Sequence, residues 1–339
     1  MVATYRLKPK KHLFPYKWNL SNTKFTKDKG SVFECFASGG GSSMGYKLAG
    51  FDVIGCNEID KRMMKAYIAN HNPKYSYLEP IQTFKSRKDL SKELYNLDIL
   101  SGSPPCSGFS LAGDRGKTWG IKKKFKEGQA EQILDTLFFD FIDLAKKLQS
   151  KLFIAENVKG LIQGKAVKYL EKVYKELDKA GYVANHYLLD ASKMGVPQKR
   201  ERVFVIGIRK DLAAPFVKKH GLFGYKLKLD MTFNEKEIPL RMFAKGKPKT
   251  DRMNYLSDRF GDVVVNLNKP SQTLTTINRY WLDSNNVLDD DTIAQIGTFP
   301  LDYQYPNKNK LYVNAMAVPP VLMAQVAKRI HEQILSKIQ

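Results

Sequence analysis

At 339 residues, the chain is long enough to bury a sizeable hydrophobic core and to form two domains. Its formal net charge of +22 predicts a polyanionic partner, and nucleic acid fits this excess better than an anionic membrane surface does. We find no apolar run of membrane-spanning length and no signal peptide, so we expect no membrane contact and a cytoplasmic location. Cys35, Cys56 and Cys106 have neither metal-ligand nor disulfide spacing, which predicts a reducing compartment and no bound metal.

Residues 1–30 form a basic N-terminal extension, with eight Lys/Arg against one acid, Asp28. Phe14, Tyr16 and Trp18 are interspersed with these charges. Lysines attract phosphates and bases stack on aromatic rings, so the extension can be an arm that contacts nucleic acid. A solvated extension is the alternative that this composition also allows.

Short apolar runs alternate with amphipathic patterns between residues 31 and 209. The expected strands are 32–37, 51–56, 97–100, 152–155, 183–189 and 203–208, and the expected helices lie near 60–70, 129–149 and 166–180. This alternation is typical of an α/β fold with a doubly wound, mostly parallel sheet.

The alternation ends after Arg209. The stretch that follows is basic, turn-rich and irregular, and regular structure resumes near Asp290 with a last helix expected over Pro320–Lys337. We therefore expect a main domain over 31–209, a smaller irregular unit over 210–289, and a segment over 290–339 that returns to the main domain.

The first expected strand leads into a glycine-rich turn at 37–41. Glycines in such a turn let a ligand approach the backbone and open the N-terminus of a helix. The second strand ends at Glu58, where a carboxylate can accept hydrogen bonds from ribose hydroxyls, and Phe36 can pack against adenine. The turn does not have the Gly-x-Gly-x-x-Gly spacing of dinucleotide-binding folds. The pattern therefore indicates a nucleoside-bearing cofactor and disfavours a nicotinamide dinucleotide.

Cys106 follows an apolar strand that Pro104-Pro105 end abruptly, which places its thiol on a rigid turn. In open α/β sheets, catalytic groups gather beyond such strand ends. The residue type alone favours a buried structural cysteine. Glycines at 108, 113 and 116 would let the following segment move as a lid.

Charged residues stand at two further strand boundaries. Glu156 follows the strand expected at 152–155, where a buried acid is costly unless it is paired or catalytic. Arg200 and Arg202 alternate at the start of the last strand, where they can bind a carboxylate and a carbonyl bidentately. A structural salt bridge and an ordinary basic strand edge are the alternatives.

Together, these motifs resemble those of the DNA cytosine-5 methyltransferases of bacterial or phage restriction-modification type. Pro-Pro-Cys-Ser-Gly-Phe-Ser is similar to the nucleophile motif, and the glycine-rich turn is similar to Phe-Ala-Gly-x-Gly-Gly, with Ser38 at its first glycine. Glu-Asn-Val and Gln-x-Arg-x-Arg follow, and Lys-Pro-Ser-Gln-Thr273 resembles Arg-Pro-Ser-x-Thr. The stretch 297–303 resembles Gly-Phe-Pro-x-x-Tyr with Thr298 as an extra residue, and 314–320 resembles Gly-Asn-Ala-Val-Pro-Pro.

The resemblance implies a class I, Rossmann-like methyltransferase that uses S-adenosylmethionine to methylate C5 of a flipped-out cytosine in a specific double-stranded DNA sequence. Cys106 would attack C6, Glu156 would protonate N3, and Arg200 and Arg202 would orient Glu156 and the cytosine carbonyl. The implied cofactor contacts are Phe36, Ser38, Gly39, Gly40, Glu58, Ile59, Ile81, Pro105, Leu137, Asn314 and Met316. The implied DNA contacts are Ser110, Arg115, Gln198, Arg241, Arg252, Thr273 and Arg279, with 210–289 as the target-recognition region. We further expect a monomer and, as a possible partner, a cognate restriction endonuclease.

Met316 marks the largest departure from the family pattern, because the asparagine that binds the amino-acid end of the cofactor aligns with it. Either Asn314 reaches the cofactor through a shifted turn, or the cofactor binds weakly. The alternative functions are RNA (tRNA) cytosine-5 methylation and DNA binding by a catalytically weakened relative. No cysteine follows Cys106 and no Cys-Phe-Thr element occurs, which disfavours the RNA enzymes.

Overall fold

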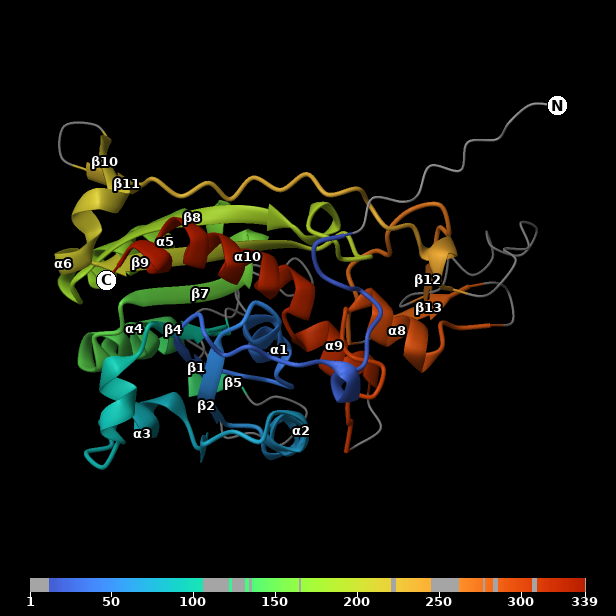
Figure 1. Ribbon diagram of the computed structural model, residues 1–339, viewed down its shortest axis with the longest axis horizontal. Helices are drawn as coiled ribbons and strands as arrows, with labels where there is room; N and C mark the ends of the chain where they lie inside the picture. Colours follow the sequence, from blue (N-terminus) through green and yellow to red (C-terminus); the bar gives the residue numbers. More distant parts are fainter. Residues whose placement is uncertain are drawn as a thin grey trace.

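The structure of the protein, a computed structural model, describes residues 12–105, 122–123, 132–133, 136–164, 166–220, 224–244, 262–276, 278–282, 286–306 and 310–338. Its centre is a seven-stranded sheet in the order β3-β2-β1-β4-β7-β9-β8 (Figure 1). The strands are β1 (Ser31–Cys35), β2 (Asp52–Glu58), β3 (Tyr75–Leu78), β4 (Ile99–Gly102), β7 (Leu152–Val158), β8 (Tyr182–Asp190) and β9 (Glu201–Arg209).

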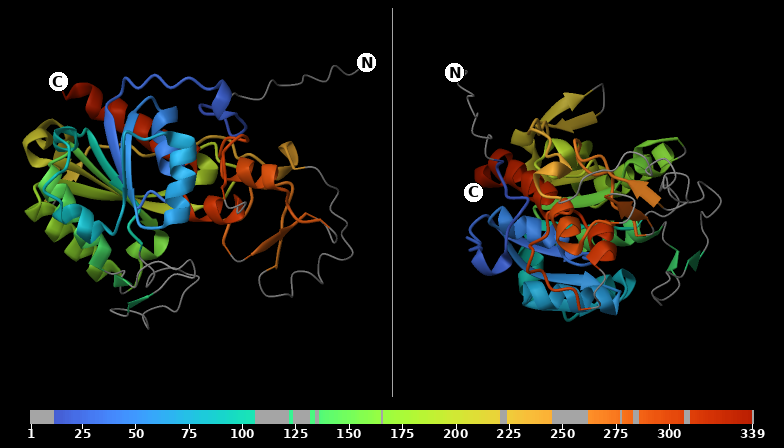
Figure 2. Two further views of the ribbon diagram at one scale, coloured as in Figure 1. Left: turned by 90° about the horizontal axis from the view of Figure 1, so that it is seen from below. Right: turned by 90° about the vertical axis from the view of Figure 1, so that its right-hand side faces the viewer.

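Helices cover both faces of this sheet (Figures 1 and 2). The helices of the described chain are α1 (Gly41–Leu48), α2 (Lys61–His71), α3 (Ile81–Ser86), α4 (Leu137–Leu148), α5 (Ala166–Lys179), α6 (Lys210–Ala213), α8 (Asp290–Ile296), α9 (Lys310–Met316) and α10 (Pro320–Gln333), of which α8 and α9 lie beside β12 and β13 rather than on the sheet. No helix in the described ranges has both the length and the apolarity that crossing a membrane requires.

Alternation of side chains along β1 divides the core into two layers. Phe33 and Cys35 pack with α3, α4 and α5 on one face. Val32 packs with α1 and α10 on the other face. Since both faces are covered, the central strands are apolar runs with little exposed surface, as parallel sheets require.

The predicted doubly wound, mostly parallel α/β sheet is confirmed. β1, β2, β3, β4 and β7 pair in parallel. The sequence did not predict that β9 lies between β7 and β8 and runs antiparallel to both. It also missed β3 and α3, because β3 is a short edge strand whose polar and aromatic residues give no apolar run.

Smaller strand pairs lie outside this sheet. They are β5 (Lys122–Lys123) with β6 (Gln132–Ile133), β10 (Val217–His220) with β11 (Gly224–Leu227), and β12 (Asp262–Val264) with β13 (Arg279–Trp281). β12, β13 and α8 lie at the opposite end of the molecule from β10, β11 and the C-terminus (Figure 1). Tyr280 and Leu282 share a separate apolar cluster with Leu240 and Ile296, so this end has its own core.

The described part of the N-terminal extension packs against the chain's C-terminal part. Trp18 is buried, and its indole Nε1 donates to the carbonyl of Thr298 at 3.0 Å. The carboxylate of Asp302 accepts from the backbone N–H groups of Leu20 and Ser21 at 2.6 and 2.9 Å. Thr298, the extra residue of the 297–303 motif, adopts a left-handed φ of 58°, and its carbonyl accepts this hydrogen bond from Trp18.

Candidate active site

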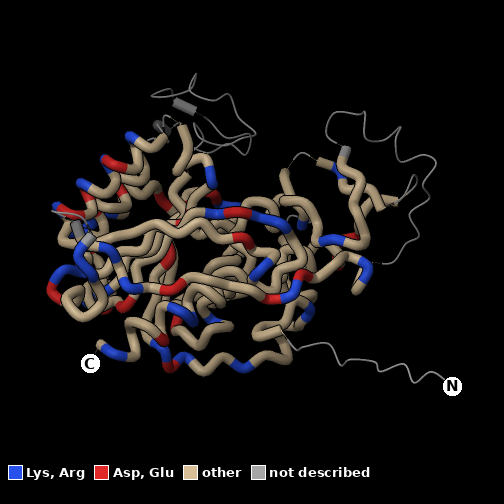
Figure 3. The backbone as a smooth tube through the Cα atoms, turned by 90° about the horizontal axis from the view of Figure 1, so that it is seen from above, with Lys and Arg blue, Asp and Glu red and all other residues tan. Residues whose placement is uncertain are grey.

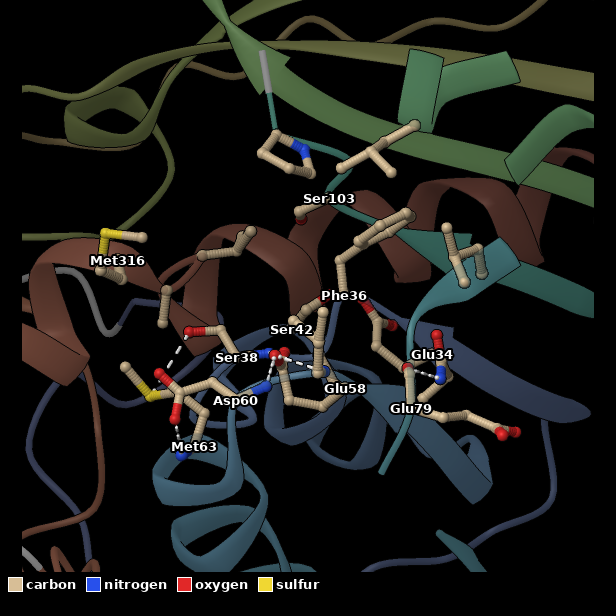
Figure 4. Close-up of a pocket in the computed structure, with 18 of the residues that line it drawn as sticks. Glu34, Phe36, Ser38, Ser42, Glu58, Asp60, Met63, Glu79, Ser103 and Met316 are labelled. Atoms are coloured by element: carbon tan, nitrogen blue, oxygen red, sulfur yellow. Dashed lines mark hydrogen bonds between the residues drawn. The ribbon is translucent and has the colours of Figure 1, made fainter. Parts of the chain in front are cut away.

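A pocket lies beyond the carboxyl ends of β1, β2 and β4, where ligands bind in open α/β sheets (Figure 4). Eight of the predicted cofactor contacts line it: Phe36, Ser38, Glu58, Ile59, Ile81, Pro105, Leu137 and Met316. Other lining residues, which the sequence analysis did not select, include Glu34, Ser42, Asp60, Met63, Glu79, Ser103, Tyr312 and Ala317. Met316 and Glu79 lie at opposite ends of the pocket (Figure 4).

The loop after β1 has an unusual backbone. Phe36, Ser38 and Gly40 adopt left-handed φ angles of 52°, 49° and 87°. For residues with a side chain this conformation costs about 1–2 kcal/mol each, so contacts from elsewhere must hold it. Glycine is required at position 40, where a Cβ would lie 2.3 Å from His71 Nε2. Gly39 and Gly40 therefore shape the loop although neither lines the pocket.

Glu58 holds this loop from the second strand. Its Oε2 accepts from the backbone N–H of Ser38 at 2.6 Å, and its Oε1 accepts from those of Ile59 and Asp60, both at 2.8 Å. Burial raises the pKa of Glu58, and these backbone donors oppose that effect. The acid predicted to contact a ribose is therefore also the residue that fixes the loop.

Glu34 is a candidate functional residue that the sequence analysis missed. It lies in β1, lines the pocket, and is only 1% exposed. Burial raises the pKa of its carboxyl group to about 8, while hydrogen bonds from Ser42 and Ser101 lower it in part. Its Oε2 has no hydrogen-bond partner among the described residues. The signal was present in the sequence, since an acid inside an apolar strand needs a partner.

Replacing Glu34 by Gln is expected to stabilise the folded protein increasingly as the pH rises. The pKa of this carboxyl group is about 4.5 in the unfolded chain and about 8 in the folded protein, so ionisation favours unfolding between these values. Each rise of one pH unit in this window lowers the free energy of unfolding of the wild type by up to about 1.4 kcal/mol. Urea unfolding at pH 5 and pH 8 measures the difference, with the exposed Glu171→Gln as the matched control. An equal difference between wild type and Glu34→Gln at both pH values would contradict the assignment.

The structure separates Asn314 and Met316, the two positions that could correspond to the asparagine of the family's C-terminal motif. Asn314 is 1% exposed, does not line the pocket, and donates its amide to the hydroxyl of Tyr305 at 3.1 Å and to the carbonyl of Lys310 at 2.8 Å. Met316 lines the pocket and is 47% exposed. The structure thus places a thioether, and not an amide, at the pocket wall.

The predicted catalytic acid and arginines meet at the ends of β7 and β9. Glu156 Oε1 lies 3.1 Å from Arg202 Nε, and both side chains are mostly buried. Arg200 is 3% exposed and donates through Nη2 to the carbonyls of Ala315 and Ala317, each at 3.1 Å. Burial first and Arg202 second lower the pKa of Arg200 to about 9.

Arg200 connects two parts of the site. Its Nη2 donates to the carbonyls on either side of Met316, which lines the pocket. Its Nε and Nη1 are buried without a partner among the described residues. An unpaired buried N–H is costly, so these donors are suited to a ligand's acceptor.

Asn157 links the strand that carries Glu156 to the segment that precedes Cys106, the predicted nucleophile. Its side-chain amide donates to the carbonyl of Pro104 at 3.1 Å, and Pro105 lines the pocket. Cys106 lies outside the described residues, but the chain is placed up to the residue before it. The Glu-Asn-Val and Pro-Pro-Cys motifs, predicted separately, are therefore joined.

The predicted DNA contacts other than Gln198 fall into three groups. Arg241 and Arg279 are exposed at the end of the molecule that carries β12 and β13, whereas Ser110, Arg115 and Arg252 lie outside the described residues. Thr273 donates its hydroxyl to the carbonyl of Lys199 at 2.8 Å. Figure 3 shows that Lys and Arg are interspersed with Asp and Glu along the described chain.

Gln198 differs from the other predicted DNA contacts because it is fully buried. Its side chain accepts from the N–H of Leu274 at 3.2 Å and donates to the carbonyl of Ile296 at 3.4 Å. In this structure Gln198 joins the main sheet to the smaller unit and is not exposed to a DNA ligand.

Comparison with known proteins identifies a family for this chain. The sequence model of the family described as C-5 cytosine-specific DNA methylase matches residues 30–276. The chain belongs to this family. The match leaves out most of the N-terminal extension and the C-terminal part that carries α8, α9 and α10.

Relatives within the family include type II methyltransferases. The chain is 36% identical to M.FnuDI of Fusobacterium nucleatum over 53% of this chain and 47% of that protein. It is 38% identical to M.Sau96I of Staphylococcus aureus over 57% of this chain and 42% of that protein. The match therefore spans about half the length of these relatives. M1.HphI of Haemophilus parahaemolyticus is 27% identical over 88% of this chain and 86% of that protein.

Solved structures with the same fold come from distant organisms. A protein described as a prophage-encoded DNA modification methyltransferase of E. coli superposes with a TM-score of 0.64 at 18% identity, over 89% of this chain and 99% of that one. DNMT2 of Spodoptera frugiperda superposes with a TM-score of 0.60 at 18% identity, over 88% of this chain and 99% of that one. At these identities the likeness supports the fold alone, which is that of a class I methyltransferase.

Proposed function

We propose that the protein transfers a methyl group from S-adenosylmethionine to C5 of cytosine in a specific sequence of double-stranded DNA. The observation that carries this proposal is the joining of two motifs at one pocket. Pro105 precedes the nucleophile candidate, and Asn157, next to Glu156, holds the carbonyl of Pro104. A cysteine that follows a pocket-lining proline, and an acid whose neighbour bonds to the same segment, suit covalent activation of a base.

The pocket residues fit S-adenosylmethionine, which supplies an electrophilic methyl group when bound. Phe36 and Ile81 suit its adenine, and the unpaired oxygen of the buried Glu34 carboxyl suits a hydrogen-bond donor of the cofactor. Glu58 remains our candidate for the ribose contact. Met316 stands at the end where the amino-acid part would lie, which makes that end poor in hydrogen-bond partners.

In the proposed reaction, the Cys106 thiolate adds to C6 while Glu156 protonates N3. The electron pair thus placed on C5 accepts the methyl group. A base then removes the C5 proton, the C5–C6 double bond re-forms as the thiolate leaves, and the N3 proton returns to the Glu156 carboxylate. Arg202 orients Glu156, and the unpaired donors of Arg200 suit the cytosine carbonyl. The cytosine must leave the duplex, which costs a few kcal/mol.

We propose that residues 210–289 choose the DNA target. Arg241 and Arg279 are exposed there, and six Lys/Arg against two acids occur between residues 241 and 259. Positive side chains beside a separate core can follow phosphates and reach base edges. A monomer in the cytoplasm, with a cognate endonuclease as a possible partner, remains our expectation.

Transfer of a labelled methyl group tests the proposal. The purified protein is expected to label double-stranded DNA and not tRNA, and bisulfite sequencing should place the label on cytosine within one short sequence. A chimaera that carries a relative's target-recognition region in place of 210–289 should methylate the relative's sequence. Labelling of tRNA alone would support the RNA alternative. Binding of DNA without any transfer would support the catalytically weakened relative.

A further inference from the structure

The cofactor loop has a second support that comes from the far end of the chain. Tyr303 is 4% exposed, and its hydroxyl donates to the carbonyl of Gly39 in the loop after β1. Its ring packs against Phe299, with ring centroids 4.9 Å apart, and against Tyr305 at 5.3 Å. The hydroxyl is therefore aimed at the loop by an aromatic cluster that does not itself belong to the pocket.

His71, the last residue of α2, supports the Tyr303 hydroxyl. His71 Nε2 lies 3.0 Å from that hydroxyl, and the imidazole stacks on Tyr67 with centroids 4.4 Å apart. Burial lowers the pKa of His71 well below its ordinary value, so the ring is neutral. Since the tyrosine donates its single proton to Gly39, the ring must donate from Nε2. His71 thus fixes the direction in which the hydroxyl points.

The loop after β1 packs directly against Tyr303 and His71. A Cβ at Gly40 would stand 2.3 Å from His71 Nε2 and 2.9 Å from the Tyr303 hydroxyl. Glu58 holds the N–H of Ser38 at 2.6 Å, and Tyr303 holds the carbonyl of the next residue. Side chains from two different segments therefore hold backbone groups of two consecutive residues in a loop that contains left-handed residues.

We propose that Tyr303, supported by His71, is a positioning residue for S-adenosylmethionine, because it holds the left-handed loop in its binding conformation. This inference rests on the proposed function. Loss of the Tyr303 hydroxyl should leave residues 301–304 in place, because other hydrogen bonds hold them. The amide of Asn70 bonds to both the N–H and the carbonyl of Gln304 at 2.8 Å, and the N–H of Leu301 donates to the carbonyl of Trp18 at 2.9 Å.

The test compares Tyr303→Phe with Tyr182→Phe by calorimetric titration with S-adenosylmethionine. Tyr182 is a matched control, because its buried hydroxyl donates to the carbonyl of Ser150, far from the pocket. We expect about tenfold weaker binding for Tyr303→Phe, as one hydrogen bond of about 1.4 kcal/mol implies, and unchanged binding for Tyr182→Phe. His71→Phe keeps the ring stack on Tyr67 and is expected to weaken binding in the same direction.

Ser38→Gly supplies a readout that a merely structural role would not give. Glycine adopts the left-handed conformation readily, so the loss caused by Tyr303→Phe should shrink several-fold in a Ser38→Gly background. If wild type binds the cofactor and Tyr303→Phe and His71→Phe bind it equally well, this inference is wrong and the proposed function stands. If wild type does not bind S-adenosylmethionine, the proposed function fails and this inference fails with it.

Discussion

Cys106→Ser is expected to lower the rate of methyl transfer by at least about a thousandfold while leaving S-adenosylmethionine binding nearly unchanged. An alcohol is a far weaker nucleophile than a thiolate, and without covalent addition at C6 the C5 atom of cytosine cannot attack a methyl group. Single-turnover transfer of labelled methyl to a duplex with a mapped target measures the rate. Calorimetric titration with the cofactor shows whether the variant has kept its fold.

A covalent adduct gives an independent readout for the same residue. With 5-fluorocytosine at the target, C5 carries no removable proton, so the wild type should remain bonded to the DNA and Cys106→Ser should not. Cys56→Ala is the matched control, because Cys56 is buried and does not line the pocket. It should keep both transfer and adduct formation. Wild-type turnover by Cys106→Ser would remove this thiol from the mechanism.

Met316→Asn is expected to bind S-adenosylmethionine about ten- to a hundredfold more tightly than the wild type. A hydrogen bond to a charged group contributes about 1.5–3 kcal/mol, and the thioether of methionine offers only a weak acceptor. Met316 lines the pocket, whereas the amide of Asn314 is directed to Tyr305 and Lys310. The position therefore supports weak native binding over a shifted turn in which Asn314 reaches the cofactor.

Calorimetry on three variants separates these possibilities. Met316→Leu keeps an apolar side chain of similar size and should bind the cofactor like the wild type. Asn314→Ala should be less stable, because it loses two hydrogen bonds in the interior, but its folded form should bind the cofactor normally. A loss of affinity in Asn314→Ala together with no gain in Met316→Asn would reverse the assignment.

The sequence predicted the parts of the molecule that depend on local pattern. Apolar runs indicated β1, β2, β4, β7 and β9, because central strands that are buried on both faces must be apolar, and a further run indicated the edge strand β8. The ordered motifs indicated the family, which the comparison confirms, and the Glu-Asn-Val and Gln-x-Arg-x-Arg motifs named the residues that form the Glu156–Arg202 pair. Local signals failed at β3, because an edge strand needs no continuous apolar run.

Only the tertiary structure decided the features that depend on where distant segments meet. The insertion of β9 between β7 and β8 follows from strand pairing that no local pattern specifies. The burial of Gln198 depends on the close approach of Leu274 and Ile296. The support of Gly39 by Tyr303 joins residues 264 positions apart. A motif specifies which chemical groups are present, but burial, side-chain direction and hydrogen-bond partners are fixed when the chain packs, and these determine whether a group contacts a ligand or holds the fold.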